Sequence, residues 1–153
     1  MLGTLSFEPA ASTDAEQLVA LRIVAMRESL ASIGRFDPRR VRERFLDTFD
    51  PALTRHILLN AQRVGFVVTR PQADYLFLNH LYVLPGFQGR GIGAWVLQSV
   101  FSEADVQGLP VKVGALRGSD SNRFYLRHGF VLTHEEEFDL YYWRDTTAPV
   151  VEA

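Results

Sequence analysis

The chain has 153 residues, the length of one ordinary domain, and its apolar share of 47% and charged share of 22% are typical of a soluble globular protein. A formal net charge of −2 gives no electrostatic case for binding nucleic acid or an anionic membrane. The absence of cysteine excludes disulfides, thiolate metal sites and a cysteine acyl-enzyme. With no basic leader and no long apolar run, we expect a cytoplasmic protein.

The N-terminal part predicts one short strand and two helices. Leu5–Phe7 is a strand candidate, and Thr13 with Glu16 is typical of a capping box that opens a helix. Gly34 ends that helix, and Asp37 followed by Pro38 predicts the start of a second one. The first helix has one apolar stripe, formed by Val19, Ile23, Met26, Leu30 and Ile33.

The rest of the chain alternates strands and helices. We expect strands at 56–60, 63–69, 75–84, 111–116, 130–133 and 138–144, with helices from Ile92 to before Gly108 and over 121–128. The order β-α-α-β-β-β-α-β-α-β-β predicts a mixed α/β sheet of six to seven strands with about four helices. Residues 1–145 are expected to form a single domain and 146–153 a flexible tail. An exposed edge strand near Phe138–Arg144 would permit a homodimer.

The segment between the strand at 75–84 and the next helix is rich in glycine. Glycines 89, 91 and 93 allow sharp turns and leave the backbone N–H groups uncovered. Because these N–H groups precede a helix N-terminus, they predict a site for phosphate groups.

The same segment also fits a dinucleotide-binding fingerprint, read as Gly89-x-Gly91-x-x-Ala94. That fingerprint requires an acidic residue at the end of the next strand, about 20 residues later. The next strand candidate, Val111–Leu116, contains no acidic residue, and half of the chain precedes the loop. Both observations speak against a nicotinamide-dependent oxidoreductase.

Read as Gln88-x-x-Gly91-x-Gly93-Ala94, the loop resembles the acyl-CoA-binding motif of the GNAT superfamily of N-acyltransferases. The preceding strand end, Leu81-Tyr82-Val83, is similar to that family too. Downstream, the segment from Asn122 to Phe130, with Tyr125 four residues before Gly129, resembles the family's second signature. The resemblance covers roughly residues 5–144 and implies the GNAT fold, a mostly antiparallel sheet splayed at the strand before the glycine loop.

The resemblance implies acetyl-CoA as co-substrate and a set of residues that bind it. Backbone groups of Leu81 and Val83 would hold the pantetheine arm and polarise the thioester carbonyl. The phosphates would lie on the glycine loop. The full set of coenzyme-binding candidates is Leu81, Tyr82, Val83, Gln88, Gly89, Arg90, Gly91, Ile92, Gly93, Ala94 and Asn122.

The catalytic candidates are Tyr125, His80 and Asn79. By resemblance Tyr125 is the general acid, since a phenol with a pKa near 10 can protonate a departing thiolate; the alternative is a tyrosine packed in the core. Counting by twos along the strand puts Asn79 on the ligand face and His80 on the other. Asn79 would orient a water. His80 becomes the base if a bulge turns it, and otherwise packs under a helix.

Several side chains keep two interpretations. Asn122 either replaces an asparagine that relatives use to bind pantetheine or caps its own helix. Arg90 either pairs with a phosphate or is solvated. Arg123 and Arg127 are expected at the surface, as are His128 and His134. No spacing of His or carboxylates suggests metal ligands, so no metal is predicted.

The expected reaction is direct acetyl transfer from acetyl-CoA to a primary amine, in a small molecule or a peptide. A catalytically silent acyl-CoA sensor is the alternative. Glu28 and the acidic run 135–137 would attract a cationic amine, although a solvated turn also explains the run. Acceptor contacts are expected from six side chains that are equally compatible with ordinary core packing: Met26, Leu30, Phe36, Tyr82, Tyr141 and Trp143.

Overall fold

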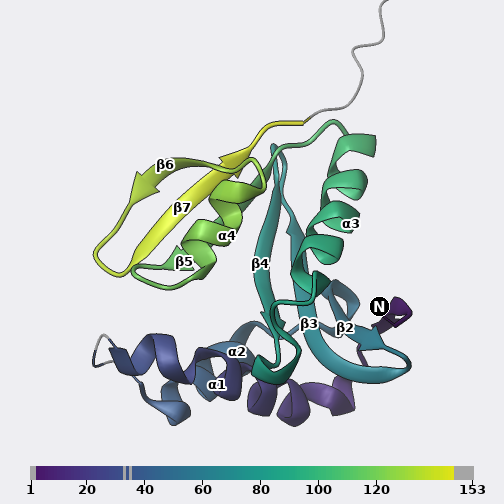
Figure 1. The fold of residues 1–153 in the computed structure, drawn as a ribbon, viewed down its shortest axis with the longest axis vertical. Coiled ribbons are helices and arrows are strands. Elements are labelled where there is room, and N and C mark those ends of the chain that lie inside the picture. The colour runs from purple at the N-terminus through teal and green to yellow at the C-terminus, as the bar shows by residue number, and fades with distance from the viewer. Residues whose placement is uncertain (1–2, 33, 35, 147–153) are drawn as a thin grey trace, which may run out of the picture. The chain divides into compact units, whose positions relative to one another are not determined.

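The computed structural model describes residues 3–32, 34 and 36–146, and its chain forms two compact units (Figure 1). The first unit contains the chain up to Val68 together with His80–Gly93. The second unit contains Thr69–Asn79 and the described residues 94–146. The single domain expected over 1–145 stays a prediction. Of the tail expected at 146–153, residues 147–153 lie outside the described residues.

The order of elements confirms the predicted β-α-α-β-β-β-α-β-α-β-β pattern. The strands form one mixed sheet in the order β1-β2-β3-β4-β5-β7-β6. None of the helices within the described ranges combines the length and hydropathy that a membrane span requires. The strands are β1 (Leu5–Pro9), β2 (Thr54–Leu59), β3 (Gln62–Pro71), β4 (Leu76–Val83), β5 (Val111–Leu116), β6 (Val131–Glu135) and β7 (Asp139–Arg144), and the α-helices are α1 (Ala15–Ser32), α2 (Pro38–Thr48), α3 (Ile92–Val106) and α4 (Ser121–Arg127).

The core of the first unit lies between α1, α2 and β3. Leu18 and Val19 from α1 pack with Phe45 from α2 and with Phe66 from β3, and all four are at most 3% exposed. The predicted N-cap of α2 is confirmed, because the Asp37 carboxylate accepts hydrogen bonds from the N–H groups of residues 39 and 40. Gly34 ends the α1 turn with a φ of 70°.

The β2–β3 hairpin turns at Asn60 and Ala61, which have φ angles of 51° and 68°. Two left-handed residues are typical of the tight turn that matches strand twist. The register of this hairpin shifts after Ile57, whose partner is Gly65. A Cβ at Gly65 would overlap the carbonyl oxygen of Tyr82 on β4, so a glycine is required where these two backbones approach.

The capping box expected at Thr13 and Glu16 is wrong. A short 3₁₀ turn, Ser12–Asp14, precedes α1, and the Asp14 carboxylate accepts a hydrogen bond from the N–H of Ala11. Glu16 instead pairs with Arg42 of α2. Asp14 also contacts His56 and Arg63, and these contacts fix its side chain beside the turn.

Asp14 is the centre of a polar cluster in the first unit. Its Oδ2 lies 2.9 Å from Nε2 of His56, which is 1% exposed, and its Oδ1 lies 3.3 Å from the Arg63 guanidinium. The hydrogen bond from Ala11, the bond to His56 and the charge of Arg63 lower the pKa of Asp14 from 3.8 to about 2. The folded state therefore favours the ionised carboxylate.

Asp14 makes stability depend on pH in acid. Because its folded pKa lies below its unfolded value of 3.8, its stabilising effect is present above about pH 4 and is lost as the pH falls toward about 2. We expect the difference in unfolding free energy between the wild type and Asp14→Asn to shrink over that range. Urea unfolding at several pH values measures it, with the exposed Asp47→Asn as control. A difference that is constant with pH would contradict this assignment.

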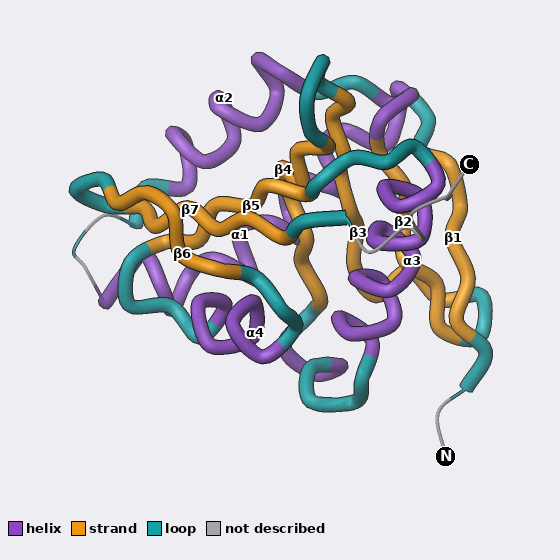
Figure 2. The backbone as a smooth tube through the Cα atoms, turned by 90° about the horizontal axis from the view of Figure 1, so that it is seen from above, coloured by secondary structure: helices purple, strands orange, loops and turns teal. Residues whose placement is uncertain are grey.

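The second unit contains the parallel pair β4–β5, in register over Leu76–Leu78 with Val111–Val113, and the antiparallel strands β5, β7 and β6 (Figure 2). The helix α4 contacts β5. The edge strand expected at 138–144 is wrong, because β7 lies between β5 and β6, and the edge on that side is β6. Every residue of β6 is exposed, including Val131 at 64%.

Candidate active site

The glycine loop begins at the end of β4 in the first unit. A 3₁₀ turn over Pro85–Phe87 opens it, with the Phe87 N–H donating to the Leu84 carbonyl at 2.9 Å and the Gln88 N–H donating to the Pro85 carbonyl at 3.3 Å. Leu84 donates to Val64 of β3 at 2.8 Å. The first half of the loop is therefore closed by its own hydrogen bonds and fixed to the sheet.

Gln88 connects the loop to the strand that precedes it. Its side-chain Nε2 donates to the carbonyl oxygen of Val83 at 2.9 Å. The first residue of the glycine motif thus holds the strand end and the loop together, a contact that sequence spacing alone did not reveal.

The second half of the loop exposes its backbone. Gly89 and Gly91 have φ angles of 74° and 80°, in the left-handed region that side chains rarely adopt. A Cβ at Gly89 would meet nothing within 4 Å, so backbone conformation and not space requires the glycine. Within the described chain, the N–H groups of Gly89, Arg90 and Gly91 donate to no backbone acceptor.

These amides continue into the first turn of α3. The N–H groups of Ile92, Gly93 and Ala94 have no acceptor inside the helix, and the 15-residue helix adds the partial positive charge of its N-terminus. Ile92 is 1% exposed and anchors the turn. The segment from 89 to 94 is therefore a run of donors suited to an anion.

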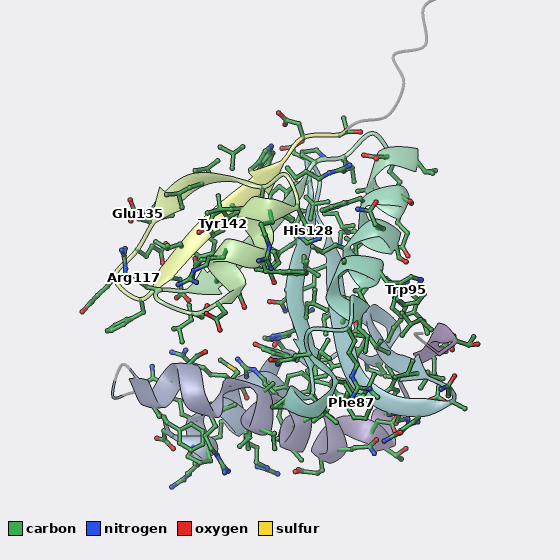
Figure 3. All side chains as sticks on the ribbon, viewed as in Figure 1. Phe87, Trp95, Arg117, His128, Glu135 and Tyr142 are labelled. Atoms are coloured by element: carbon green, nitrogen blue, oxygen red, sulfur yellow. The ribbon has the colours of Figure 1, made fainter. Side chains whose placement is uncertain are left out.

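Arg90 is exposed at this loop. Its guanidinium carbon lies 5.3 Å from the ring centroid of Phe87, which Figure 3 labels. The stacking orders the side chain and leaves its donors at the surface.

The end of β4 in the first unit carries two aromatic side chains toward α1 and α2. The His80 ring lies 5.6 Å from that of Phe45, 6.2 Å from that of Phe66 and 5.7 Å from that of Tyr82. The Tyr82 hydroxyl donates to the sulfur of Met26 on α1 at 3.4 Å. The His80 ring thus lies against Phe45 of α2, and whether His80 acts as a base stays a prediction. In the second unit, Asn79 is partly buried.

Tyr125 lies in the second unit with its ring in the core. It is 5% exposed, and its ring centroid is 5.3 Å from that of Phe130 and 6.3 Å from that of Tyr142. Its carbonyl accepts hydrogen bonds from the N–H groups of His128 and Phe130, which close the turn after α4. The ring packing fixes the place of the side chain.

Asn122 makes structural hydrogen bonds. Its Nδ2 lies 2.9 Å from the carbonyl oxygens of Leu116 and Ser119, and its Oδ1 accepts from the Tyr142 hydroxyl at 2.8 Å. Burial and, to a lesser degree, Glu135 raise the pKa of Tyr142, which keeps that hydroxyl protonated as a donor. These bonds connect Asn122 to the end of β5, to the preceding loop and to β7, whereas the N-cap of α4 is Asp120. Neither sequence interpretation of Asn122 is confirmed by them, and its contact with pantetheine stays a prediction.

Outside these candidates, the second unit contains a surface hollow and an acidic turn. The side chains of Arg117 and Glu135, both labelled in Figure 3, pair at 3.3 Å. His134 contacts Glu136 at 3.0 Å, so part of the acidic run is locally compensated. The described residues contain no group of three or more potential metal ligands. The hollow, of about 640 Å³, includes none of the predicted catalytic or coenzyme-binding residues and one predicted acceptor contact, Trp143. It is lined by Gln98, Phe101, His128, Gly129, Val131, Thr133, Trp143, Arg144, Asp145 and Thr146.

Solved structures with this fold include several acetyltransferases. PaiA N-acetyltransferase from Thermoplasma acidophilum, solved in complex with coenzyme A, has a TM-score of 0.77 at 14% identity, over 93% of this chain and 99% of that one. An acetyltransferase from Thermus thermophilus has a TM-score of 0.73 at 22% identity, over 95% and 99%. The ribosomal-protein-S18-alanine N-acetyltransferase of Escherichia coli has a TM-score of 0.73 at 13% identity, over 98% and 99%.

The comparison with family models is more specific than the shared fold. No protein of curated function matches the chain significantly. The model of the acetyltransferase (GNAT) domain matches residues 54–132, just over half of the chain, and that span contains both the glycine loop and Tyr125. The protein therefore belongs to the GNAT family of acetyltransferases.

Proposed function

We propose that this protein transfers the acetyl group of acetyl-CoA directly to a primary amine, with Tyr125 as general acid. The observation that carries the proposal is the run of unpaired backbone amides from Gly89 into α3, in a chain of the GNAT family. The Thermoplasma structure of the same fold was solved with coenzyme A, which supports this choice of co-substrate.

The loop fits the phosphates of the coenzyme. Two left-handed glycines and the free N–H groups up to Ala94 offer several donors to a pyrophosphate without a covering side chain. Gln88 acts by fixing the loop to Val83, whose carbonyl it occupies. The N–H of Val83 and the backbone of Leu81 and Tyr82 would then hold the pantetheine arm, as the sequence resemblance implies.

The chemistry needs only a few groups, because the thioester is already activated. Holding a neutral amine beside the thioester lowers the activation barrier, because the two reactants no longer have to find each other in solution. The amine nitrogen forms a bond to the carbonyl carbon, the carbon–sulfur bond breaks, and the thiolate takes a proton from the Tyr125 hydroxyl. The former amine nitrogen loses one proton to water, and the Tyr125 phenolate takes one proton back from water, which returns the enzyme to its starting state. A phenol of ordinary acidity carries its proton near pH 7 and can give it to a thiolate.

The ammonium form of the acceptor must first lose a proton. The packing of His80 between Phe45 and Phe66 favours a structural role for its ring. We therefore assign this step to water, with Asn79 orienting it, as amide side chains can hydrogen-bond water but cannot take a proton. His80 would then have a packing role beside the acceptor.

The proposal is tested by measuring thiol release from acetyl-CoA in the presence of primary amines. Because the chain has no cysteine, a thiol reagent reports free coenzyme A alone. At a hundredfold excess over its Kd, acetyl-CoA should stabilise the folded protein by about 2.7 kcal/mol and so raise its melting temperature. We expect NAD⁺ to leave the melting temperature unchanged. Binding without turnover of any amine would identify a sensor instead, and no binding would refute the proposal.

A further inference from the structure

The α1 helix carries a charged side chain on its packed face. Leu18, Arg22 and Met26 follow one another at four-residue steps and share that face. Leu18 is 1% exposed, and Met26 contacts the Tyr82 hydroxyl at the end of β4. Arg22, partly buried, therefore lies one helical turn from the residue that contacts the strand leading into the glycine loop.

The Arg22 guanidinium has few partners for a cation in this position. Its Nη1 donates to the carbonyl oxygen of Val41 on α2 at 2.8 Å. Its Nε is buried and has no hydrogen-bond acceptor, and none of the described carboxylates pairs with it. The partly buried Arg63 of the same unit, in contrast, pairs with both Glu8 and Asp14.

The remaining charges on these two helices do not compensate it. Besides Arg22, the α1 helix contains Glu16, Arg27 and Glu28, and the α2 helix contains Arg39, Arg40, Arg42 and Arg44 against Glu43 and Asp47, so arginines outnumber acidic residues on the pair. Glu43 pairs with Arg39, and Glu16 of α1 pairs with Arg42, which leaves Arg40 and Arg44 exposed on the surface. The helical pair thus has a positive field that attracts an anion.

We propose that the acceptor is an amine that carries a carboxylate, and that Arg22 binds this carboxylate. The proposal rests on the acetyl transfer proposed above. With Nη1 held by Val41, the Nε and Nη2 donors form the other edge of the guanidinium, whose spacing matches the two oxygens of a carboxylate. Moving that edge toward an anion breaks no bond of Nε, because Nε has none. A cationic amine without an acidic group would be repelled.

The test compares acceptors that differ only in the carboxylate. Thiol release is measured with free L-amino acids, with the corresponding carboxamides and with unbranched diamines. We expect kcat/KM for the preferred amino acid to exceed that of its carboxamide by about tenfold or more, in line with a charge-assisted hydrogen bond. Added salt should reduce the difference, since the surface arginines contribute to attraction.

Two variants separate ligand binding from a structural role. Arg22→Gln should remove most of the preference by raising the KM of the amino acid, with kcat and the KM for acetyl-CoA within about twofold. Arg44→Gln, which removes one exposed charge of the surrounding field and no direct contact, should keep most of the preference. Melting temperatures show whether Arg22→Gln folds, and if it does not, the wild-type preference alone decides.

Three results would overturn the proposal. The first is acetylation of carboxamides or diamines by the wild type at the same rate as amino acids. The second is an equal loss of activity with every acceptor in Arg22→Gln, which would show that Arg22 only holds α1 and α2 together. Absence of thiol release with all amines, together with no calorimetric binding of acetyl-CoA, would refute acetyl transfer itself and is distinguishable from the first two.

Discussion

Replacing Tyr125 by phenylalanine is expected to lower kcat by about two orders of magnitude or more, while the affinity for acetyl-CoA stays within about twofold. The ring is 5% exposed and packs against Phe130 and Tyr142, and phenylalanine keeps these ring contacts. The substitution removes only the hydroxyl, which supplies the proton to the departing thiolate in the proposed mechanism. The loss should therefore appear in turnover and not in binding.

The neighbouring Tyr142→Phe is the matched control. Its hydroxyl donates to Asn122 at 2.8 Å, so its removal should cost about 1 kcal/mol of stability and change kcat only slightly. Thiol release at saturating acetyl-CoA and calorimetric titration of coenzyme A measure both effects. A kcat for Tyr125→Phe within threefold of the wild type would remove Tyr125 from the mechanism.

Replacing Gly89 by aspartate is expected to weaken acetyl-CoA binding by about two orders of magnitude or more. The φ of 74° at this position is one that aspartate adopts more readily than most residues, and the added Cβ would meet nothing within 4 Å. The variant should therefore fold. Its carboxylate would stand beside the amides proposed to bind the pyrophosphate, and repulsion between the two anions lowers the affinity.

Gly86→Asp provides the comparison, because it adds the same charge three residues earlier. A Cβ there also meets nothing within 4 Å, and the residue belongs to the 3₁₀ turn that precedes the exposed amides. We expect this variant to bind acetyl-CoA within about fivefold of the wild type. Equal losses for both variants would show that net charge near the loop, and not the amides at 89–94, determines binding.

The sequence was informative where a local pattern has one physical solution. Val111–Leu116 and the helix N-cap at Asp37 were predicted correctly, since strand alternation and capping depend on neighbouring residues. The edge strand was placed wrongly, at 138–144, because periodicity identifies a strand without naming its neighbours. Only the antiparallel pairing of β7 with β5 on one side and β6 on the other decides which strand is outermost.

The candidate site was predictable as a set of residue types and less so as a set of contacts. The glycine positions indicated a loop with exposed amides, and the left-handed φ angles of Gly89 and Gly91 agree with that prediction. The bonds of Gln88 to Val83 and of Asn122 to Tyr142 join residues through side-chain directions that spacing does not specify. Arg22 was missed, although a charged residue four positions from both Leu18 and Met26 interrupts a packed face.

The contact between Gly65 and Tyr82 limits how this family member can vary. A methyl group at Gly65 would push against the Tyr82 carbonyl and displace the last residues of β4, which Gln88 joins to the glycine loop through Val83. A position in the β2–β3 hairpin thus constrains the backbone at the end of β4, from which the glycine loop begins. Any side chain at position 65 would therefore act on the glycine loop through a shift of the β4 backbone.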